Sequence, residues 1–247
     1  MNHWGRIFFC YENGNLNRAI GQPLENHINN CREILSRFRD EFFHPESRAR
    51  LDKAVELHDL GKRETFRVTY ETNKNGQTLK NEQSKPWGYS FAGHRFRVPH
   101  DDPYVAGLIR AHHEFSIEQI NREKAMLKEE EDRKRFADDL YLLCMADQLE
   151  AELAVKTVEG KNDVSRTFME FTTWRPDRSS FDFTIMPWPF GPVSFPLTFK
   201  LMELQEPKLL NLAEKDKKTM NKWFRETGMF KATEMTINLV REVVDGH

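Results

Sequence analysis

The sequence predicts a mainly α-helical protein, a helical bundle followed by a small mixed C-terminal part that contains short strands. Two observations favour this class. Apolar residues recur at helical spacing in several segments between Pro23 and Val158. After Gly160, short β-type segments alternate with runs rich in proline, glycine and serine. We therefore expect a helical domain over residues 1–160 and an α+β extension over residues 161–247 packed on it.

The first half of the helical domain is expected to open with a strand at residues 6–11. The Asn-Gly pair that follows this strand is typical of a turn. Helices are then expected over residues 23–42 and 46–60, with Gly61 as the C-terminal cap of the second helix. Residues 67–100 lose this periodicity and predict a long loop or a weak hairpin, and long loops in compact domains are often functional.

The remaining elements follow from capping residues and spacing. Asp101 or Asp102 can cap a helix that opens at Pro103, and another helix is expected from Ser116. A long helix should cover residues 133–158. Short strands are expected at residues 168–174, 181–188 and 198–204, and helices near residues 207–226 and 231–245.

Composition limits the classes of protein that are possible. The chain has 247 residues, of which 31% are charged and 38% hydrophobic, as is typical of soluble globular proteins. A net charge of −2 gives no overall attraction to nucleic acid, so a polyanion would need a local basic patch or metal ions. Three distant cysteines without a CxxC pair indicate neither a disulfide framework nor a zinc–thiolate site. Neither a signal peptide nor a membrane span is evident, so we expect a cytoplasmic protein.

Potential metal ligands lie on the apolar face or at the end of four predicted helices. They are His27, the pair His58–Asp59, the pair His112–His113, and Asp147, with His94 and His100 in the preceding loop. One inward-facing histidine is usually structural, but a buried carboxylate without partners is costly, and the ordered combination favours a metal site. Imidazole and carboxylate groups suit manganese, iron, cobalt, nickel or zinc. One carboxylate can also bridge two ions, as in two-metal phosphoester hydrolysis.

These residues resemble the motifs of the HD-domain metal-dependent phosphohydrolases. The dyad His58–Asp59 matches the motif that gives the family its name, with His27 upstream and Asp147 downstream. The segments "HDLGKRETF", "GHRF" and "IRAHHEF" are similar to those of the HD nuclease of type I CRISPR interference. The resemblance covers roughly residues 20–155 and implies an HD-type helical bundle.

The resemblance also implies a set of ligands for two divalent ions, which could be manganese, nickel, cobalt, iron or magnesium. His27, His58, Asp59 and Asp147 would hold the first ion, and Asp59, His94, His112 and His113 the second. Asp59 would bridge the two ions and, with Lys62, form the catalytic pair. Lys62 and Arg95 would also bind the substrate. His100 remains an alternative to His94.

The function implied by the resemblance is cleavage of single-stranded DNA, with RNA as a second substrate, in CRISPR interference. The absence of a GxxxxGK[ST] motif implies the stand-alone nuclease subunit, which works with a separate helicase and an effector complex. Residues 61–97 carry eight Lys and Arg against three Glu, with Trp87, Tyr89 and Phe91 among them. This pattern suits a single strand, but a solvated loop with aromatic core residues would give it as well.

Two other functions share parts of this pattern. A phosphohydrolase acting on a nucleotide or a cyclic nucleotide would use every one of the same metal ligands. A non-catalytic adaptor could keep a metal for structure alone, although structural sites usually fill their coordination with protein ligands.

Overall fold

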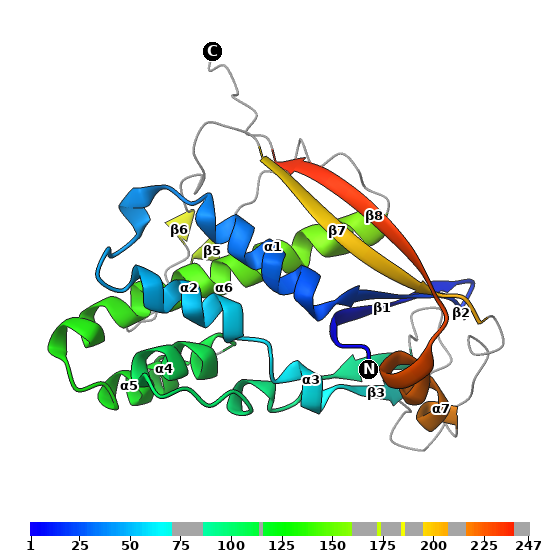
Figure 1. Cartoon of the computed structure of the whole chain (residues 1–247), viewed down its shortest axis with the longest axis horizontal. Coiled ribbons are helices and arrows are strands. Elements are labelled where there is room, and N and C mark those ends of the chain that lie inside the picture. The colour runs from blue at the N-terminus through cyan, green and yellow to red at the C-terminus, as the bar shows by residue number, and fades with distance from the viewer. Residues whose placement is uncertain are drawn as a thin grey trace, which may run out of the picture. The chain divides into compact units, whose positions relative to one another are not determined.

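The computed structural model describes residues 1–70, 86–113, 116–159, 172–173, 184–185, 195–206 and 216–239 (Figure 1). Helices and strands are mixed along this part of the chain. The helices are α1 (Leu24–Ser36), α2 (Arg48–Leu57), α3 (Lys62–Thr65), α4 (Pro103–Ala111), α5 (Ile117–Ala125), α6 (Glu130–Val158) and α7 (Lys217–Lys222). The strands are β1 (Trp4–Glu12), β2 (Asn15–Pro23), β3 (Arg67–Tyr70), β4 (Trp87–Ser90), β5 (Thr172–Thr173), β6 (Thr184–Ile185), β7 (Phe195–Leu204) and β8 (Phe230–Leu239).

The prediction of a mainly α-helical bundle, with strands only in a small C-terminal part, is wrong. A four-stranded sheet joins both ends of the chain in the order β1-β2-β7-β8, and β3 pairs with β4 in a second sheet. The protein is therefore a mixed α and β structure. The sheet was missed because its strands are far apart in sequence, and β2 contains Asn, Gly and Pro residues of low strand propensity.

The N-terminal hairpin follows from local turn chemistry. Asn13 and Gly14 both have positive φ, 49° and 77°, as a two-residue type I′ turn requires. The predicted strand at residues 6–11 and the turn after it are thus confirmed. Antiparallel pairing then runs from Glu12↔Asn15 to Trp4↔Pro23, with register shifts between Cys10 and Tyr11 and between Trp4 and Arg6, so the turn sets the register only next to itself.

Contacts divide the chain into two compact units. The first consists of residues 1–27, 60–94 and 199–235, and the second of residues 28–59, 95–198 and 236–247. Each unit takes residues from both sides of residue 160, where the sequence predicted a domain boundary. The division passes through two continuous helical elements, α1 and the short 3-10 helix η2 (His94–Phe96).

Aromatic side chains form the core of the first unit. The core joins residues of β1, β2, the β3–β4 hairpin, β7 and the segment around α7; its members are Trp4, Ile7, Leu16, Ala19, Phe66, Val68, Trp87, Phe91, Leu204, Met220 and Phe224. The Trp4 indole N–H donates to the Phe224 carbonyl oxygen at 2.6 Å, which satisfies the one polar group of this buried side chain. Two of the aromatic residues suggested to interleave with basic groups, Trp87 and Phe91, belong to this core.

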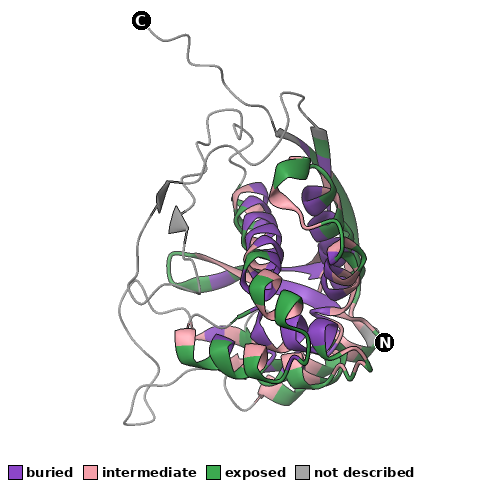
Figure 2. Ribbon diagram, turned by 90° about the vertical axis from the view of Figure 1, so that its left-hand side faces the viewer, coloured by how far each residue is buried: buried purple, intermediate pink, exposed green. Residues whose placement is uncertain are grey.

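The second unit contains α2, α4, α5, α6 and most of α1, and buried residues line these helices (Figure 2). The predicted helices are confirmed, except that the first, expected over residues 23–42, ends at Ser36. The Asp102 carboxylate caps α4 by accepting from the Tyr104 amide at 2.8 Å. Gly61 was wrongly predicted as a C-terminal cap. Its φ is −63°, a helical value, and it precedes α3, while His58 ends α2.

A polar cluster ties α2, α4 and α6 together. The Arg50 guanidinium donates twice to the Asp132 carboxylate, at 2.8 and 2.5 Å, and lies 4.1 Å from the Tyr104 ring centroid. The Tyr104 hydroxyl in turn donates to Asp139 at 2.7 Å, and burial raises the pKa of that carboxyl group. These contacts fix three helices that each carry, or are directly followed by, a candidate metal ligand.

We expect Asp132→Asn to weaken the dependence of the free energy of unfolding on pH in the acid range. The Arg50 hydrogen bonds hold the pKa of Asp132 below its ordinary value. The contribution of Asp132 to stability is therefore present at neutral pH and is lost as pH falls from about 4 through the lower folded pKa. Denaturant unfolding at several pH values should show a loss of about 1 kcal/mol at pH 7 in the variant and a smaller loss on acidification. Asp138→Asn, on the same helix and exposed, is the control; an acid profile unchanged by Asp132→Asn would contradict the expectation.

The C-terminal predictions had different outcomes. The strand at residues 198–204 is confirmed as part of β7, but the helix at residues 231–245 is wrong, because residues 230–239 form β8 beside β7. A helix at residues 207–226 is confirmed in part by α7, which continues into a π-helical turn at Trp223–Thr227. Residues 172–173 and 184–185 are strands as expected, and the rest of those segments lies outside the described residues. Within the described part of the chain, no helix is both long and apolar enough to cross a bilayer.

Candidate metal centre

The structure brings all seven predicted ligands into two neighbouring groups. The first group is His27, Cys31, His58 and Asp147, and the second is Asp59, His94, His112 and His113. Within each group, one ligand atom of every residue lies within 4.8 Å of those of the others. The buried groups could therefore hold metal ions.

Helix ends place most of these side chains. His58 is the residue that ends α2, and His112 is the residue that ends α4. His94 opens η2, whereas Asp147 lies within the long helix α6. Ligands on packed helices hold their position better than ligands on loops.

Three histidines are oriented by the same hydrogen bond. Each uses Nδ1 to reach the carbonyl oxygen three residues earlier: His58 to Val55 at 2.7 Å, His94 to Phe91 at 2.8 Å, and His112 to Ile109 at 2.6 Å. A carbonyl oxygen only accepts, so Nδ1 carries the proton and Nε2 carries the lone pair in the neutral ring. Metal-bound histidines are held in this way by outer partners.

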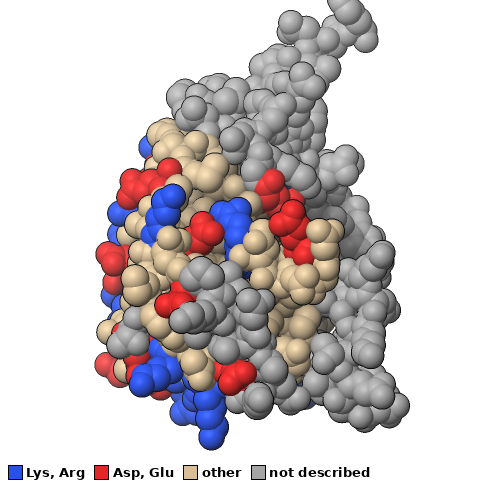
Figure 3. Space-filling view, turned by 90° about the vertical axis from the view of Figure 1, so that its right-hand side faces the viewer, with Lys and Arg blue, Asp and Glu red and all other residues tan. Residues whose placement is uncertain are grey.

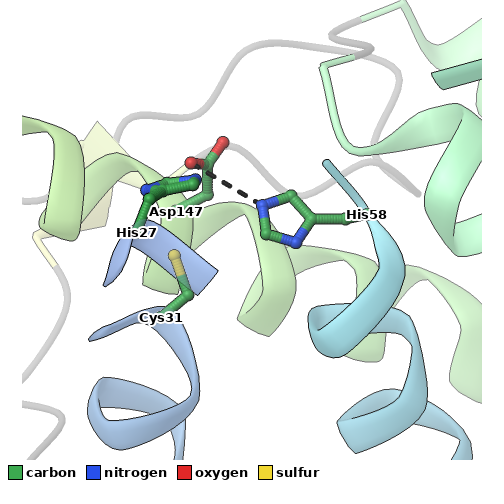
Figure 4. A group of neighbouring side chains, drawn as sticks. All are labelled: His27, Cys31, His58 and Asp147. Carbon is green, nitrogen blue, oxygen red and sulfur yellow. Dashed lines mark ion pairs between the residues drawn. The ribbon is translucent and has the colours of Figure 1, made fainter. Parts of the chain in front are cut away.

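The two oxygens of Asp59 face two different histidines. Oδ2 lies 3.5 Å from His58 Nε2, and Oδ1 lies 3.6 Å from His112 Nε2. His58 Nε2 is also 4.0 Å from Asp147 Oδ1 (Figure 4). The side chains of all four residues, His58, Asp59, His112 and Asp147, are buried. Asp59 thus stands between the first group, which contains His58, and the second, which contains His112.

These separations fit a cation better than direct hydrogen bonds. A nitrogen–oxygen hydrogen bond is about 2.7–3.2 Å long. Ligand atoms about 2.1 Å from one tetrahedral ion lie roughly 3.4 Å apart. The observed 3.5–4.0 Å distances are close to that second value. The donor set, imidazole and carboxylate, also suits a divalent transition metal.

His27 has a different outer partner from the other three histidines. Arg6 Nη2 lies 3.1 Å from His27 Nδ1, and a guanidinium only donates hydrogen bonds. His27 Nδ1 is therefore the acceptor in this contact. Nε2 then carries the ring proton, so this contact opposes metal binding through that atom.

The His27 side chain packs against the backbone at Gly5 and leaves no room for a side chain at that position. A Cβ atom added to Gly5 would lie 2.7 Å from His27 Cβ, closer than real Cβ contacts. We expect Gly5→Ala to displace the His27 ring and to weaken metal binding at the first group, with a loss of about 1–3 kcal/mol in stability from overpacking. Metal titration should show one of two binding events weakened and the other retained. Unchanged affinity for both would contradict this account of the His27 position.

Both predicted substrate-binding residues make contacts within the protein; Lys62 is buried and Arg95 is half-buried. The Lys62 ammonium, at the start of α3, donates to the Gly5 carbonyl oxygen at 3.2 Å and lies 5.1 Å from the Phe91 ring centroid. Arg95 lies over the exposed Phe96 ring, 5.0 Å from its centroid. Of the two histidines that were alternatives, His94 joins the second group, while His100 Nδ1 accepts from the Asp102 amide.

The basic segment predicted at residues 61–97 is only partly described. Lys74, Lys80 and Lys85 lie outside the described residues. Tyr89 is exposed, whereas Trp87 and Phe91 are core residues, so these two are not available for stacking with bases. On the face drawn in Figure 3, acidic and basic side chains of the described residues are intermixed.

Two residues of the site were missed from the sequence. Cys31 lies four residues after His27, on the same apolar face of α1, but its packing position suggested only a core residue. Arg6 lies in β1, far from His27 in sequence, and no spacing rule could have connected them. Searches against protein-family models, curated proteins and solved structures return no match to this chain.

Proposed function

We propose that this protein is a metal-dependent hydrolase of phosphodiester bonds that cleaves single-stranded DNA, with RNA as a second substrate. The observation that carries the proposal is the position of Asp59 between His58 and His112, whose Nε2 atoms both face it. A carboxylate in this position can serve two ions. Two-metal sites of this kind are used to hydrolyse phosphoesters.

The ligand assignment follows the two groups. His58 and Asp147 would hold one ion, joined by His27 once its ring exchanges the Arg6 contact for the metal. His94, His112 and His113 would hold the other ion, and Asp59 would contribute to both. Two bound ions would lower the pKa of a water molecule and neutralise charge that develops on the phosphate. The metals implied by the resemblance are manganese, nickel, cobalt, iron and magnesium, and the nitrogen-rich ligand sets favour transition metals.

Solvent reaches the second group at His113. Asp59, His94 and His112 are buried, whereas His113 is exposed and stacks obliquely on His112 with ring centroids 4.0 Å apart. A phosphate group arriving from solvent would meet this side of the centre first. The same open position argues against a purely structural metal, whose ligands would close the coordination sphere.

Lys62 and Arg95 remain our proposed phosphate-binding residues. For Lys62 to act in this way, its ammonium would have to exchange the Gly5 carbonyl contact for a phosphate oxygen. The proposed biological setting is CRISPR interference in the cytoplasm, in which a separate helicase and an effector complex supply the single strand. This setting is supported by the similarity of this chain's motifs to those of the HD nucleases.

One assay separates strand cleavage from nucleotide hydrolysis. The metal-free protein is loaded with manganese, cobalt or nickel and incubated with end-labelled single-stranded DNA, the matching duplex, single-stranded RNA, a mononucleotide and a cyclic nucleotide. We expect the single strands to be cut and the duplex to survive. Hydrolysis of a nucleotide with intact strands would replace the nuclease proposal by a nucleotide phosphohydrolase, and no hydrolysis with saturated metal sites would reject both.

A further inference from the structure

The two groups of ligands differ in chemistry as well as in exposure. The first group, drawn in Figure 4, contains the sulfur of Cys31 beside His27, His58 and Asp147, and all four residues are buried. The second contains only nitrogen and oxygen donors, and one of its residues, His113, is exposed. The type of donor atom and the exposure to solvent both affect which ion a site retains.

Helix geometry brings Cys31 to the first group. Cys31 follows His27 by four residues in α1, so the two side chains lie on the same face, one turn apart. Cys31 is fully buried and forms no disulfide. In Figure 4 its sulfur is directed to the same side of the helix as the His27 ring, toward Asp147.

A thiolate changes the selectivity of a site. Sulfur ligands favour zinc and other thiophilic ions, whereas carboxylate and water ligands favour magnesium and manganese. Cys31 as a ligand would also compensate for His27, whose Nδ1 accepts from Arg6. The sequence argued against a zinc–thiolate site because no CxxC pair exists, but a single cysteine in a mixed set needs no such pair.

We propose that the two metal sites are unequal: Cys31 is a ligand of the first, which retains a thiophilic ion such as zinc or cobalt, and the second exchanges its ion with solvent. This inference rests on the proposed metal centre but not on the proposed substrate. The protein would then have a mixed-metal centre, in which added manganese binds at the exposed second site.

Cobalt provides the test, because a cobalt–thiolate bond has a near-ultraviolet charge-transfer band that nitrogen and oxygen ligands do not give. The metal-free protein is titrated with cobalt while this band and the visible ligand-field bands are recorded. We expect the charge-transfer band to saturate with the first equivalent and to be lost in Cys31→Ser. Cys10→Ser is the matched control and should keep it; the same band in Cys31→Ser, or no band in the wild type at saturation, would overturn the proposal.

A second measurement needs no variant, since Cys31→Ser could fail to fold. X-ray absorption of the wild-type protein with one equivalent of zinc should show one sulfur neighbour at about 2.3 Å. Only nitrogen and oxygen neighbours would contradict the proposal. In a separate experiment on the wild-type protein loaded with two equivalents of metal, chelation should remove one ion at least ~10-fold faster than the other, and equal rates would contradict the inequality of the sites. Because these results do not involve substrate, they can fail while strand cleavage succeeds, and the reverse.

Discussion

Asp59→Asn should abolish the response of the protein to divalent metal while leaving the fold intact. The amide keeps the shape of the side chain but removes the charge that faces His58 and His112. Loss of an outer partner of a metal ligand already costs about 10–100-fold in affinity, so loss of the shared carboxylate should cost at least ~100-fold. Hydrolysis of labelled single-stranded DNA should fall to background.

The same variant separates metal binding from folding. Asp59 is fully buried, and a buried carboxylate carries a desolvation cost that an amide does not. We therefore expect metal-free Asp59→Asn to be as stable as the metal-free wild type, or more stable. Metal at ~100 times its dissociation constant should stabilise the wild type by about 2.7 kcal/mol and the variant by much less.

Thermal melts with and without metal make this comparison directly. Asp52→Asn is the matched control, because Asp52 lies on α2 with its side chain half exposed and paired with Arg48. The control should keep the full metal response. Two ions bound to Asp59→Asn with wild-type affinity would overturn the assignment of Asp59 as the shared ligand.

Phe224→Ala should cause the largest loss of stability among these variants. Phe224 is fully buried, and its ring contacts those of Trp4, Phe9, Phe66 and Phe230 at centroid distances of 5.7–6.3 Å. Truncation removes these contacts and leaves a cavity, at a cost of about 3–5 kcal/mol. That cost is a large part of the total stability of a typical domain.

Denaturant unfolding at equilibrium measures this effect. The hydrogen bond from the Trp4 indole N–H to the Phe224 backbone carbonyl does not depend on the Phe224 side chain, so the loss should report packing alone. Phe96→Ala makes the same truncation at an exposed position and should cost under ~1 kcal/mol. Equal losses for the two variants would show that Phe224 is not a central core residue.

The helices could be predicted because their signals are local. Asp102 with Pro103 marks the start of α4, since capping chemistry is decided within a few residues. Ser116 stands at the N-cap position of α5, as expected, although its side chain makes no capping hydrogen bond. The same holds for the turn at Asn13 and Gly14. The sheet could not be predicted in this way, because β2 pairs with β7, about 180 residues later, and such pairing leaves no periodic signal.

The error at β8 has a related cause. Its segment, "FKATEMTINL", contains polar and apolar residues at intervals that suit a helix as well as a strand. Pairing beside β7 decides between them, and this tertiary contact overrides weak local preference. In contrast, the candidate ligands were accessible from sequence, because His58, Asp59, His112 and His113 follow the apolar faces of α2 and α4 directly. Cys31 was not, since a cysteine on an apolar face is usually a packing residue.

Anomalous diffraction from crystals grown with cobalt tests the central claim most directly. We expect two peaks: one within bonding distance of His58 and Asp147, the other within bonding distance of His112 and His94. Asp59 should lie between them with an oxygen directed to each. Well-ordered crystals saturated with cobalt that show no peak at these residues would contradict the claim that this protein carries a two-metal centre.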